Sequence, residues 1–150
     1  MGGEKDLGIL LRSMDPELRD EEYVFCTMAR GAQGLIGLDP WAMIQEKEGT
    51  TLILKKAVAE RNGIPFQSVY RCITLNIHSS LDAVGLTAAV SSKLAKAGIS
   101  ANVVAAFYHD HVFVQKDRAG EAIASLRELT EKKLMALKPA IVITGGLPCP

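Results

Sequence analysis

The chain has few of the residues that define several large classes of protein. Aromatic residues make up 5% of its 150 residues, too few for a platform on which nucleic-acid bases stack. The three cysteines, Cys26, Cys72 and Cys149, are widely spaced and odd in number, which favours neither a disulfide framework nor a metal site. No apolar run is long enough to cross a bilayer, and the N-terminus lacks the apolar core of a secretory signal. These absences favour a cytoplasmic protein that contacts neither nucleic acid nor membrane.

Acidic and basic side chains are equally numerous, which argues further against a nucleic-acid partner. Lys and Arg together number 17, and so do Asp and Glu. A nucleic-acid binder needs a basic face that neutralises phosphates, and no basic or acidic tail stands out in this sequence. Because 48% of the 150 residues are hydrophobic, the chain can bury a core as one domain or two very small ones.

The second half of the chain contains the clearest pattern, a strand that leads into a helix. Residues 70–77 alternate between two sides, which is typical of a strand with one apolar face. Apolar residues then recur at helical spacing over residues 80–97, and Gly98 is a natural helix stop. Ser79 and Asp82 match the Ser-x-x-Asp capping pattern, so we expect the helix to start there.

Further elements complete an alternating order in this half. They are predicted as strands at residues 100–108 and 111–115, a hairpin turn at His109–Asp110, a helix at 118–137 ended by Pro139, and a strand at 140–144. The order is therefore strand, helix, strand, strand, helix, strand. Two helices with one apolar stripe each must cover one face of an antiparallel sheet. With a right-handed first crossover, this predicts an α+β fold, the ferredoxin-like βαββαβ sandwich.

The first half is less regular but contains the same types of element. The pattern predicts a helix at 6–14, strands at 22–28, 41–46 and 51–54, a glycine-containing loop at 30–39, and a helix at 55–62. We interpret this half as a diverged copy of the second half. Gly63-Ile64-Pro65 is the expected seam, which gives an N-terminal unit of residues 1–64 and a C-terminal unit of residues 65–150.

Five motifs, spread over most of the chain, carry a resemblance to a known family. They are Tyr23–Met28, Glu46–Leu52, His78–Val90, Gly98–Val103 and Tyr108–Val114. Together they resemble a bacterial family of small proteins with paired ACT domains, over residues 7 to 137. The family is similar to the regulatory ACT pairs of aspartate kinase and to the cytosolic arginine sensors of animal cells. Those proteins bind free amino acids at interfaces between ACT units.

The resemblance implies an ACT-type fold in both halves and a regulatory function. It implies a non-catalytic sensor that binds a free amino acid or a related small metabolite and thereby acts on an unidentified regulated enzyme. No pattern in the sequence indicates a cofactor, and apolar sheet edges favour a homodimer. The first alternative is a ligand-free module for protein–protein interaction and oligomerisation.

The turn between the strand and the helix of the second half is the candidate ligand site. Free amides at a helix start, together with the helix dipole, attract an anion such as a carboxylate, and Asp82 could meet an ammonium group. The candidate ligand-binding residues are Ser79, Ser80, Leu81, Asp82, Ala83, Val84, Gly85, Ile99, Asn102 and Val103, the last three through the ACT resemblance. The simpler alternative is a capping box that only stabilises the helix, by about 1 kcal/mol. Gly85 fits either room for a ligand or close packing against a neighbour.

His109, Asp110 and His111 raise a metal hypothesis, since imidazole and carboxylate groups are ligands of Zn²⁺. If the hairpin turns at His109–Asp110, the two imidazoles need not converge, and His78 is the only other histidine. We therefore predict no metal site and interpret the three residues as an interface at a hairpin tip. A metal-binding hydrolase that uses His109 and His111 is the second alternative.

Overall fold

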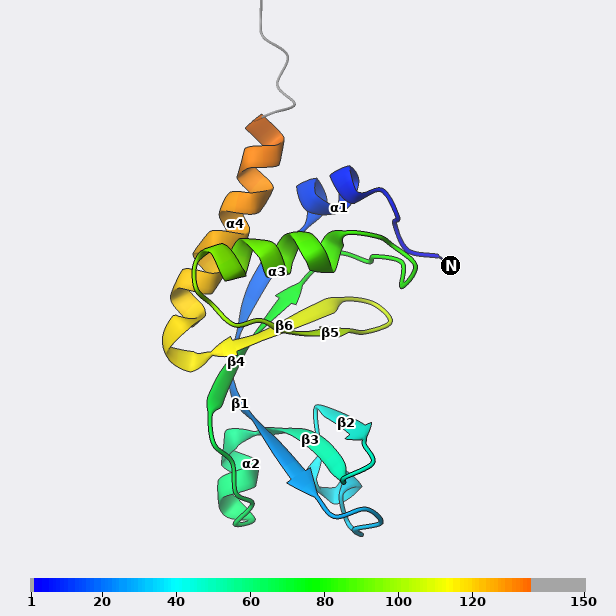
Figure 1. Ribbon diagram of the computed structural model, residues 1–150, viewed down its shortest axis with the longest axis vertical. Coiled ribbons are helices and arrows are strands. Elements are labelled where there is room, and N and C mark those ends of the chain that lie inside the picture. The colour runs from blue at the N-terminus through cyan, green and yellow to red at the C-terminus, as the bar shows by residue number, and fades with distance from the viewer. Residues whose placement is uncertain (1, 136–150) are drawn as a thin grey trace, which may run out of the picture.

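A six-stranded antiparallel sheet supports all the helices (Figure 1). This computed structural model describes residues 2–135, with side chains as far as Thr130. In chain order the elements are α1 (Leu7–Ser13), β1 (Pro16–Met28), η1 (Ile36–Leu38), β2 (Ala42–Gln45), β3 (Thr50–Lys55), α2 (Lys56–Arg61), β4 (Val69–Leu75), α3 (Leu86–Lys96), β5 (Asn102–Ala105), β6 (Asp110–Gln115), η2 (Lys116–Arg118) and α4 (Ala119–Met135). No helix within residues 2–135 is both long enough and apolar enough to span a membrane.

The two central strands belong to both halves of the molecule. The strand order is β2-β3-β1-β4-β6-β5. The end of β1 pairs with β3 and its beginning pairs with β4. Tyr23 takes part in both pairings, opposite Lys55 of β3 and Tyr70 of β4. The β2–β3 hairpin therefore pairs with β1, and β4 completes the N-terminal unit. The β5–β6 hairpin pairs with β4, and β1 completes the C-terminal unit. This order confirms the α+β ferredoxin-like (ACT) fold, with η1 and its loop replacing the first helix of the N-terminal half.

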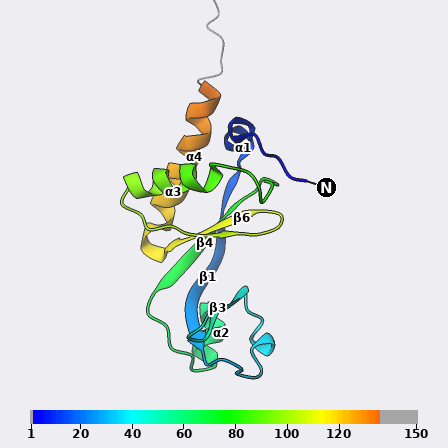
Figure 2. The ribbon, with the colours of Figure 1, turned by 45° about the vertical axis from the view of Figure 1, so that its right-hand side comes forward.

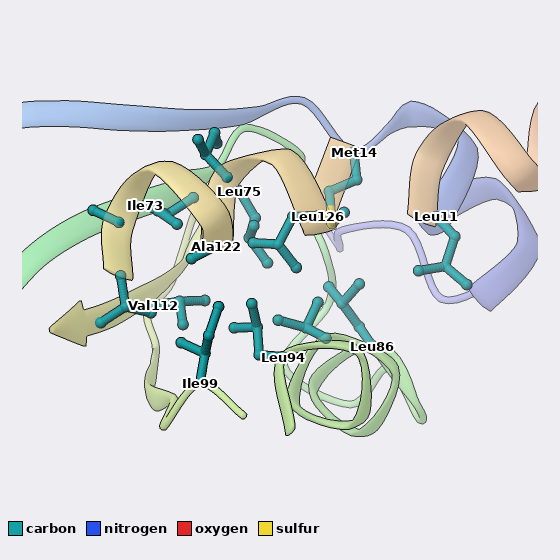
Figure 3. Close-up of a cluster of buried hydrophobic side chains, with 14 of the residues drawn as sticks. Leu11, Met14, Ile73, Leu75, Leu86, Leu94, Ile99, Val112, Ala122 and Leu126 are labelled. Carbon is teal, nitrogen blue, oxygen red and sulfur yellow. The ribbon is translucent and has the colours of Figure 1, made fainter. Parts of the chain in front are cut away.

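The helices cover one face of the sheet. Side chains alternate along each strand, so Ile73 and Leu75 of β4 point to the same face as Val112 of β6. Figure 3 shows leucines of α3 and α4 beside these residues, with Leu11 of α1 at the edge of the same cluster. Ala59 of α2 packs on the same face of the sheet, in a separate cluster. In Figure 2 the helices α1, α3 and α4 lie together at the end of the molecule near the N-terminus, away from α2.

The opposite face, which we call the helix-free face, carries a second core made of aromatic rings. Its buried side chains are Tyr23, Ile53, Cys72 and Phe113. Trp41 precedes β2, yet its ring centroid lies 4.8 Å from that of Phe113 and 4.9 Å from that of His111 on β6. Because β2 and β6 are not neighbours in the strand order, the sheet must curl to bring Trp41, beside β2, against β6.

Most predicted elements of both halves are confirmed, but the second hairpin differs in detail. The strand predicted at residues 100–108 covers only β5, and Asp110 is the first residue of β6 instead of part of the turn. The turn comprises residues 106–109, closed by the Ala106 amide, which donates to the His109 carbonyl. Asp110 is also buried, with 7% of its surface exposed. The strand predicted at residues 140–144 lies outside the described residues. In a ferredoxin-like unit the last strand lies beside the first, and here β1 takes that position beside β4.

Candidate functional site

Residues 76–85 connect β4 to α3, and we call residues 78–85 the site loop. The Glu4 amide donates to the His78 carbonyl over 3.0 Å, and the Ser80 amide donates to the Glu4 carbonyl over 2.8 Å. This pairing with the N-terminal segment holds the backbone extended. The prediction of a helix from Ser80 is therefore wrong, because α3 begins at Leu86 after Gly85, whose φ is 101°.

The serine–aspartate motif forms a turn instead of a helix cap. The Asp82 amide donates to the Ser80 hydroxyl over 3.2 Å, and the Ala83 amide donates to the Ser80 carbonyl over 2.9 Å. Serine side chains commonly close turns in this way. Of the two amides expected to hold a carboxylate, those of Leu81 and Ala83, the Ala83 amide is thus already engaged. The capping interpretation is therefore wrong. Leu81 is 64% exposed.

A small crevice nevertheless lies beside the site loop. It has a volume of about 170 Å³ and is lined by the loop from His78 to Asp82, by Gly2 and Gly3, and by Phe107 at the tip of the β5–β6 hairpin. Lys5 lies near its entrance, with its Nζ 3.9 Å from the Asp82 carboxylate, and both side chains are well exposed. The crevice therefore combines backbone and side-chain polar groups with an aromatic wall.

Exposed apolar side chains belong to the site loop and to the hairpin tip, and two of them, Leu81 and Phe107, line the crevice. They are Leu81, Val84, Phe107 and Tyr108, with 64%, 83%, 64% and 65% of their surfaces exposed, and we call them the apolar patch. The His78 ring lies between the loop and the hairpin tip, 5.7 Å from the ring centroid of Tyr108. Neighbouring exposed apolar groups of this kind mark binding surfaces more often than isolated ones do.

Three of the predicted site residues, Ile99, Asn102 and Val103, lie away from the site loop. Ile99 is 4% exposed and belongs to the core under α3, and Val103 packs against the same core. The Asn102 side-chain amide donates to the Phe113 carbonyl over 3.2 Å, at the end of β5 remote from the hairpin tip. An added Cβ on Gly85 would meet Leu7 at 2.9 Å, which fits close packing there. The fold thus separates a set of residues that the sequence grouped.

The two histidines of the β5–β6 hairpin are held apart by different partners. His109 Nδ1 lies 3.2 Å from the Ile77 carbonyl, and His111 Nδ1 lies 3.1 Å from the Thr74 hydroxyl. Burial, with smaller contributions from His109 and Arg19, lowers the pKa of His111, whereas burial raises the pKa of Asp110. Within residues 2–135, no group of three or more His, Cys, Asp or Glu side chains is arranged to hold a metal ion.

A larger pocket of about 540 Å³ opens on the helix-free face, and we call it the charged pocket. Its charged residues are Arg19, Glu21, Asp39 and Lys55, and His109 and His111 also line it. Sequence reasoning missed this pocket because its residues come from both halves of the chain. The one local signal was the run from Glu17 to Glu22, which places charged residues in the middle of a strand.

A sheet shared by two ferredoxin-like units, with a site loop after the first strand of one of them, defines a regulatory protein of the ACT type. The sequence agrees, because the ACT domain family matches residues 2–71 and, as a second ACT domain, residues 67–128. The chain belongs to the ACT-domain family and consists of two such domains in tandem. The two matches overlap at residues 67–71, where β4 begins.

Solved structures give the same result. A Vibrio cholerae protein of unknown function, described as a possible transport protein, is 47% identical with a TM-score of 0.76, covering 84% of this chain and 97% of that one. A protein from Agrobacterium tumefaciens is 14% identical with a TM-score of 0.67, covering 78% and 89%. The regulatory subunit of aspartate kinase from Thermus thermophilus is 11% identical with a TM-score of 0.56, covering 76% and 95%. No curated protein matches the sequence.

Proposed function

We propose that this protein is a non-catalytic sensor that binds a free amino acid or a related small metabolite at the site loop. The observation that carries the proposal is the crevice of about 170 Å³ between the site loop, the N-terminal segment and the hairpin tip. Pockets for drug-sized ligands usually measure about 300–1,000 Å³, so this crevice suits a much smaller molecule. Its size and its mixed polar and aromatic lining both support an amino-acid ligand.

The groups around the crevice can be assigned to parts of such a ligand. In this proposal the Leu81 amide and the Ser80 hydroxyl donate to the ligand carboxylate, and Asp82 offers a negative charge to its ammonium group. Each charge-assisted hydrogen bond contributes roughly 1.5–3 kcal/mol, so two of them would suit a micromolar to millimolar sensor. Phe107 and His78 would pack against the ligand side chain.

A ligand in the crevice would link three elements that are distant in sequence. It would contact the N-terminal segment, the site loop and the β5–β6 hairpin at once. A ligand shifts a conformational equilibrium only through different affinities for the two states. Drawing these elements together would change the surface around the crevice, which is how the protein would signal to a regulated enzyme.

The apolar patch favours a second candidate function, that of an interaction module. Leu81, Val84, Phe107 and Tyr108 are all more than half exposed at the same end of the molecule. A homodimer that covers this patch would remove these apolar groups from water. The patch and the crevice share Leu81 and Phe107, so dimer formation and ligand binding would be coupled.

The metal-hydrolase alternative receives less support from the geometry. His109 and His111 have their Nδ1 atoms next to the Ile77 carbonyl and the Thr74 hydroxyl, and each ring is oriented by its own partner. We also propose a cytoplasmic location, since Cys26 and Cys72 are buried free thiols of the kind that a reducing compartment preserves.

A thermal-melting screen against the common amino acids tests the sensor proposal. At a ligand concentration of 100 times Kd, binding adds about 2.7 kcal/mol to the free energy of unfolding, so Tm should rise by several degrees. Ser80→Ala and Asp82→Ala should each reduce this rise by weakening ligand binding. Ser92→Ala, at an exposed position on α3, is the matched control and should leave the rise intact.

Two results would contradict the proposal. One is that no amino acid raises Tm. The other is that an amino acid raises Tm equally in the parent protein, Ser80→Ala and Asp82→Ala. A concentration-dependent dimer that forms without any ligand, and that Val84→Asp abolishes, would instead support the interaction module.

A further inference from the structure

The N-terminal segment, residues 2–5, lies against the site loop, and we call it the strap. Glu4 of the strap forms a parallel β-bridge with Ser79 of the site loop. The Glu4 amide donates to the His78 carbonyl over 3.0 Å, and the Glu4 carbonyl accepts from the Ser80 amide over 2.8 Å. Both backbone polar groups of Glu4 are therefore used to dock the strap on the site loop.

Gly3 lets the backbones of the strap and the site loop approach more closely than a residue with a Cβ would allow. A Cβ added to Gly3 would lie 2.5 Å from the Ser79 carbonyl carbon and 2.6 Å from the Ser80 amide nitrogen. These are backbone atoms, so they cannot turn away as the end of a side chain can. At Gly2, by contrast, an added Cβ would meet no atom within 4 Å. The strap thus contains one glycine that docking requires and one that it does not.

The side chains of the strap contribute little to its docking. The Glu4 carboxylate turns back and accepts from the amides of Lys5 and Asp6 over 2.7 and 2.8 Å. The Lys5 ammonium group lies 3.9 Å from the Asp82 carboxylate, but both side chains are well exposed, and exposed ion pairs stabilise weakly. Docking therefore depends mainly on two backbone hydrogen bonds and on the close approach at Gly3.

The helix α1, which follows the strap, is fixed to the body of the molecule. Asp6 caps this helix, because its carboxylate accepts from the Ile9 amide over 2.9 Å. Leu10 and Leu11 of α1 are buried in the core that α3 and α4 also form. In Figure 1 the strap leads from α1 toward the N-terminus, beside the loop that precedes α3. Only the residues before Asp6 therefore depend on the site loop for their position.

The docked strap forms one wall of the crevice. Gly2 and Gly3 line the crevice together with the site loop and Phe107. A ligand in the crevice would therefore contact the strap, and it would lose these contacts if the strap left the site loop. A ligand that contacts an element in only one of its positions stabilises that position, and this coupling is equal in both directions.

From these contacts we infer that Gly3 and Glu4 are positioning residues of the ligand site, and that ligand binding and docking of the strap reinforce each other. The inference rests on the sensor proposal above and adds to it the element whose position the ligand controls. The crevice binds its ligand tightly while the strap is docked and weakly while it is not. A bound amino acid holds the strap on the site loop, so the strap carries the signal of ligand binding.

Gly3→Ala and Gly2→Ala form a matched pair of variants of the full-length protein. Each adds one methyl group, but only the methyl group at Gly3 meets the backbone of the site loop. Amide hydrogen exchange followed by NMR measures docking at the Ser80 amide, which donates to the Glu4 carbonyl. We expect this amide to exchange at least about tenfold faster in Gly3→Ala than in the parent protein, and at the parent rate in Gly2→Ala.

Ligand affinity tests the coupling between the strap and the crevice. The probes are the standard amino acids, each titrated separately by calorimetry into the parent protein and the two variants. For an amino acid that binds the parent protein, Gly3→Ala should raise Kd at least about tenfold, whereas Gly2→Ala should leave it unchanged. Saturation of the parent protein should slow exchange of the Ser80 and Glu4 amides by a similar factor. A role in stability alone would lower the Tm of Gly3→Ala without changing Kd.

A second pair of variants tests docking if Gly3→Ala fails to fold. Glu4→Pro removes the amide that donates to the His78 carbonyl, whereas Glu4→Ala keeps this amide and controls for loss of the carboxylate. The Kd of the amino acid should rise at least about tenfold more in Glu4→Pro than in Glu4→Ala.

The inference is overturned if the variant with a weakened strap binds every amino acid as tightly as its matched control does. It is also overturned if the Ser80 amide exchanges at the parent rate in Gly3→Ala, or if a bound amino acid leaves the exchange of the Ser80 and Glu4 amides unchanged. Failure of the sensor proposal gives a different result, since no amino acid would then bind the parent protein or Gly2→Ala. In that case the inference falls together with the proposal on which it rests.

Discussion

Replacing Gly85 by alanine tests where α3 begins, on which the description of the site loop depends. Gly85 precedes Leu86 with φ 101° and ψ −16°, a backbone conformation that residues with a Cβ rarely adopt. Forcing a non-glycine residue into such a conformation costs on the order of 1–3 kcal/mol. The added Cβ would also approach the Leu7 side chain to 2.9 Å, although that side chain can shift.

The sign of the effect distinguishes the two possible helix starts. If α3 began at Ser80, Gly85 would lie inside the helix, and alanine would stabilise the protein by about 1 kcal/mol. With the helix starting at Leu86, Gly85→Ala should instead lower the free energy of unfolding by about 1–3 kcal/mol. Urea denaturation followed by circular dichroism measures this free energy.

Gly120→Ala is the matched control for this experiment. Gly120 lies in the first turn of α4, and an added Cβ would meet no atom within 4 Å. This substitution should therefore stabilise the protein, by up to about 1 kcal/mol. A Gly85→Ala variant that is as stable as the parent protein, or more stable, would refute the observed helix start.

Two further predictions concern titratable groups. The pKa of His111 is lowered in the folded protein. As the pH falls through the ordinary histidine range near 6.5, the unfolded chain therefore binds protons more readily than the folded chain does. The free energy of unfolding should thus drop on acidification from about pH 7.5 to about pH 5.5. Urea titrations should show a smaller drop in His111→Gln, and an equal drop would contradict this. Burial raises the pKa of Cys72 to about 11 and also raises the pKa of Cys26. In a Cys149→Ser variant, Ellman's reagent should therefore react slowly with Cys26 and Cys72 in the native protein and rapidly after denaturation. Fast labelling of the native protein would show that the two thiols are not both buried.

The site loop and the charged pocket lie on different surfaces, and both are next to β4. The site loop follows the end of β4, on the side of α1 and α3, whereas the charged pocket lies on the helix-free face. β4 links them, since Cys72 and Thr74 face the pocket and the loop begins a few residues later. One central strand of the sheet therefore borders both the site loop and the charged pocket.

Local patterns were sufficient to predict most elements of the fold. The alternation along β4 and the helical spacing along α3 are set by which side chains must leave water, and this shows in a short window of sequence. The ferredoxin-like arrangement followed, because helices with one apolar stripe must cover one face of a sheet. The long motifs made the ACT family recognisable from the residues themselves.

The site loop shows where local patterns fail. A serine followed three residues later by an aspartate begins a helix only if the backbone is free to coil. Here Glu4 pairs with His78 and Ser80 from more than seventy residues away, and those hydrogen bonds hold the loop extended. A capping pattern contains no information about such a distant partner, so the sequence predicted a helix start where the chain forms a turn.

Sequence alone was enough for the periodicity of each element, the face that each buries and the family to which the chain belongs. The folded chain was needed to show that β1 and β4 serve both units, that the site loop bonds to the N-terminal segment, and that Arg19, Asp39 and His111 meet in one pocket. The difference is one of range. Hydrophobic periodicity acts within an element, whereas strand order, a bulge and the curl of a sheet join residues that no local pattern relates.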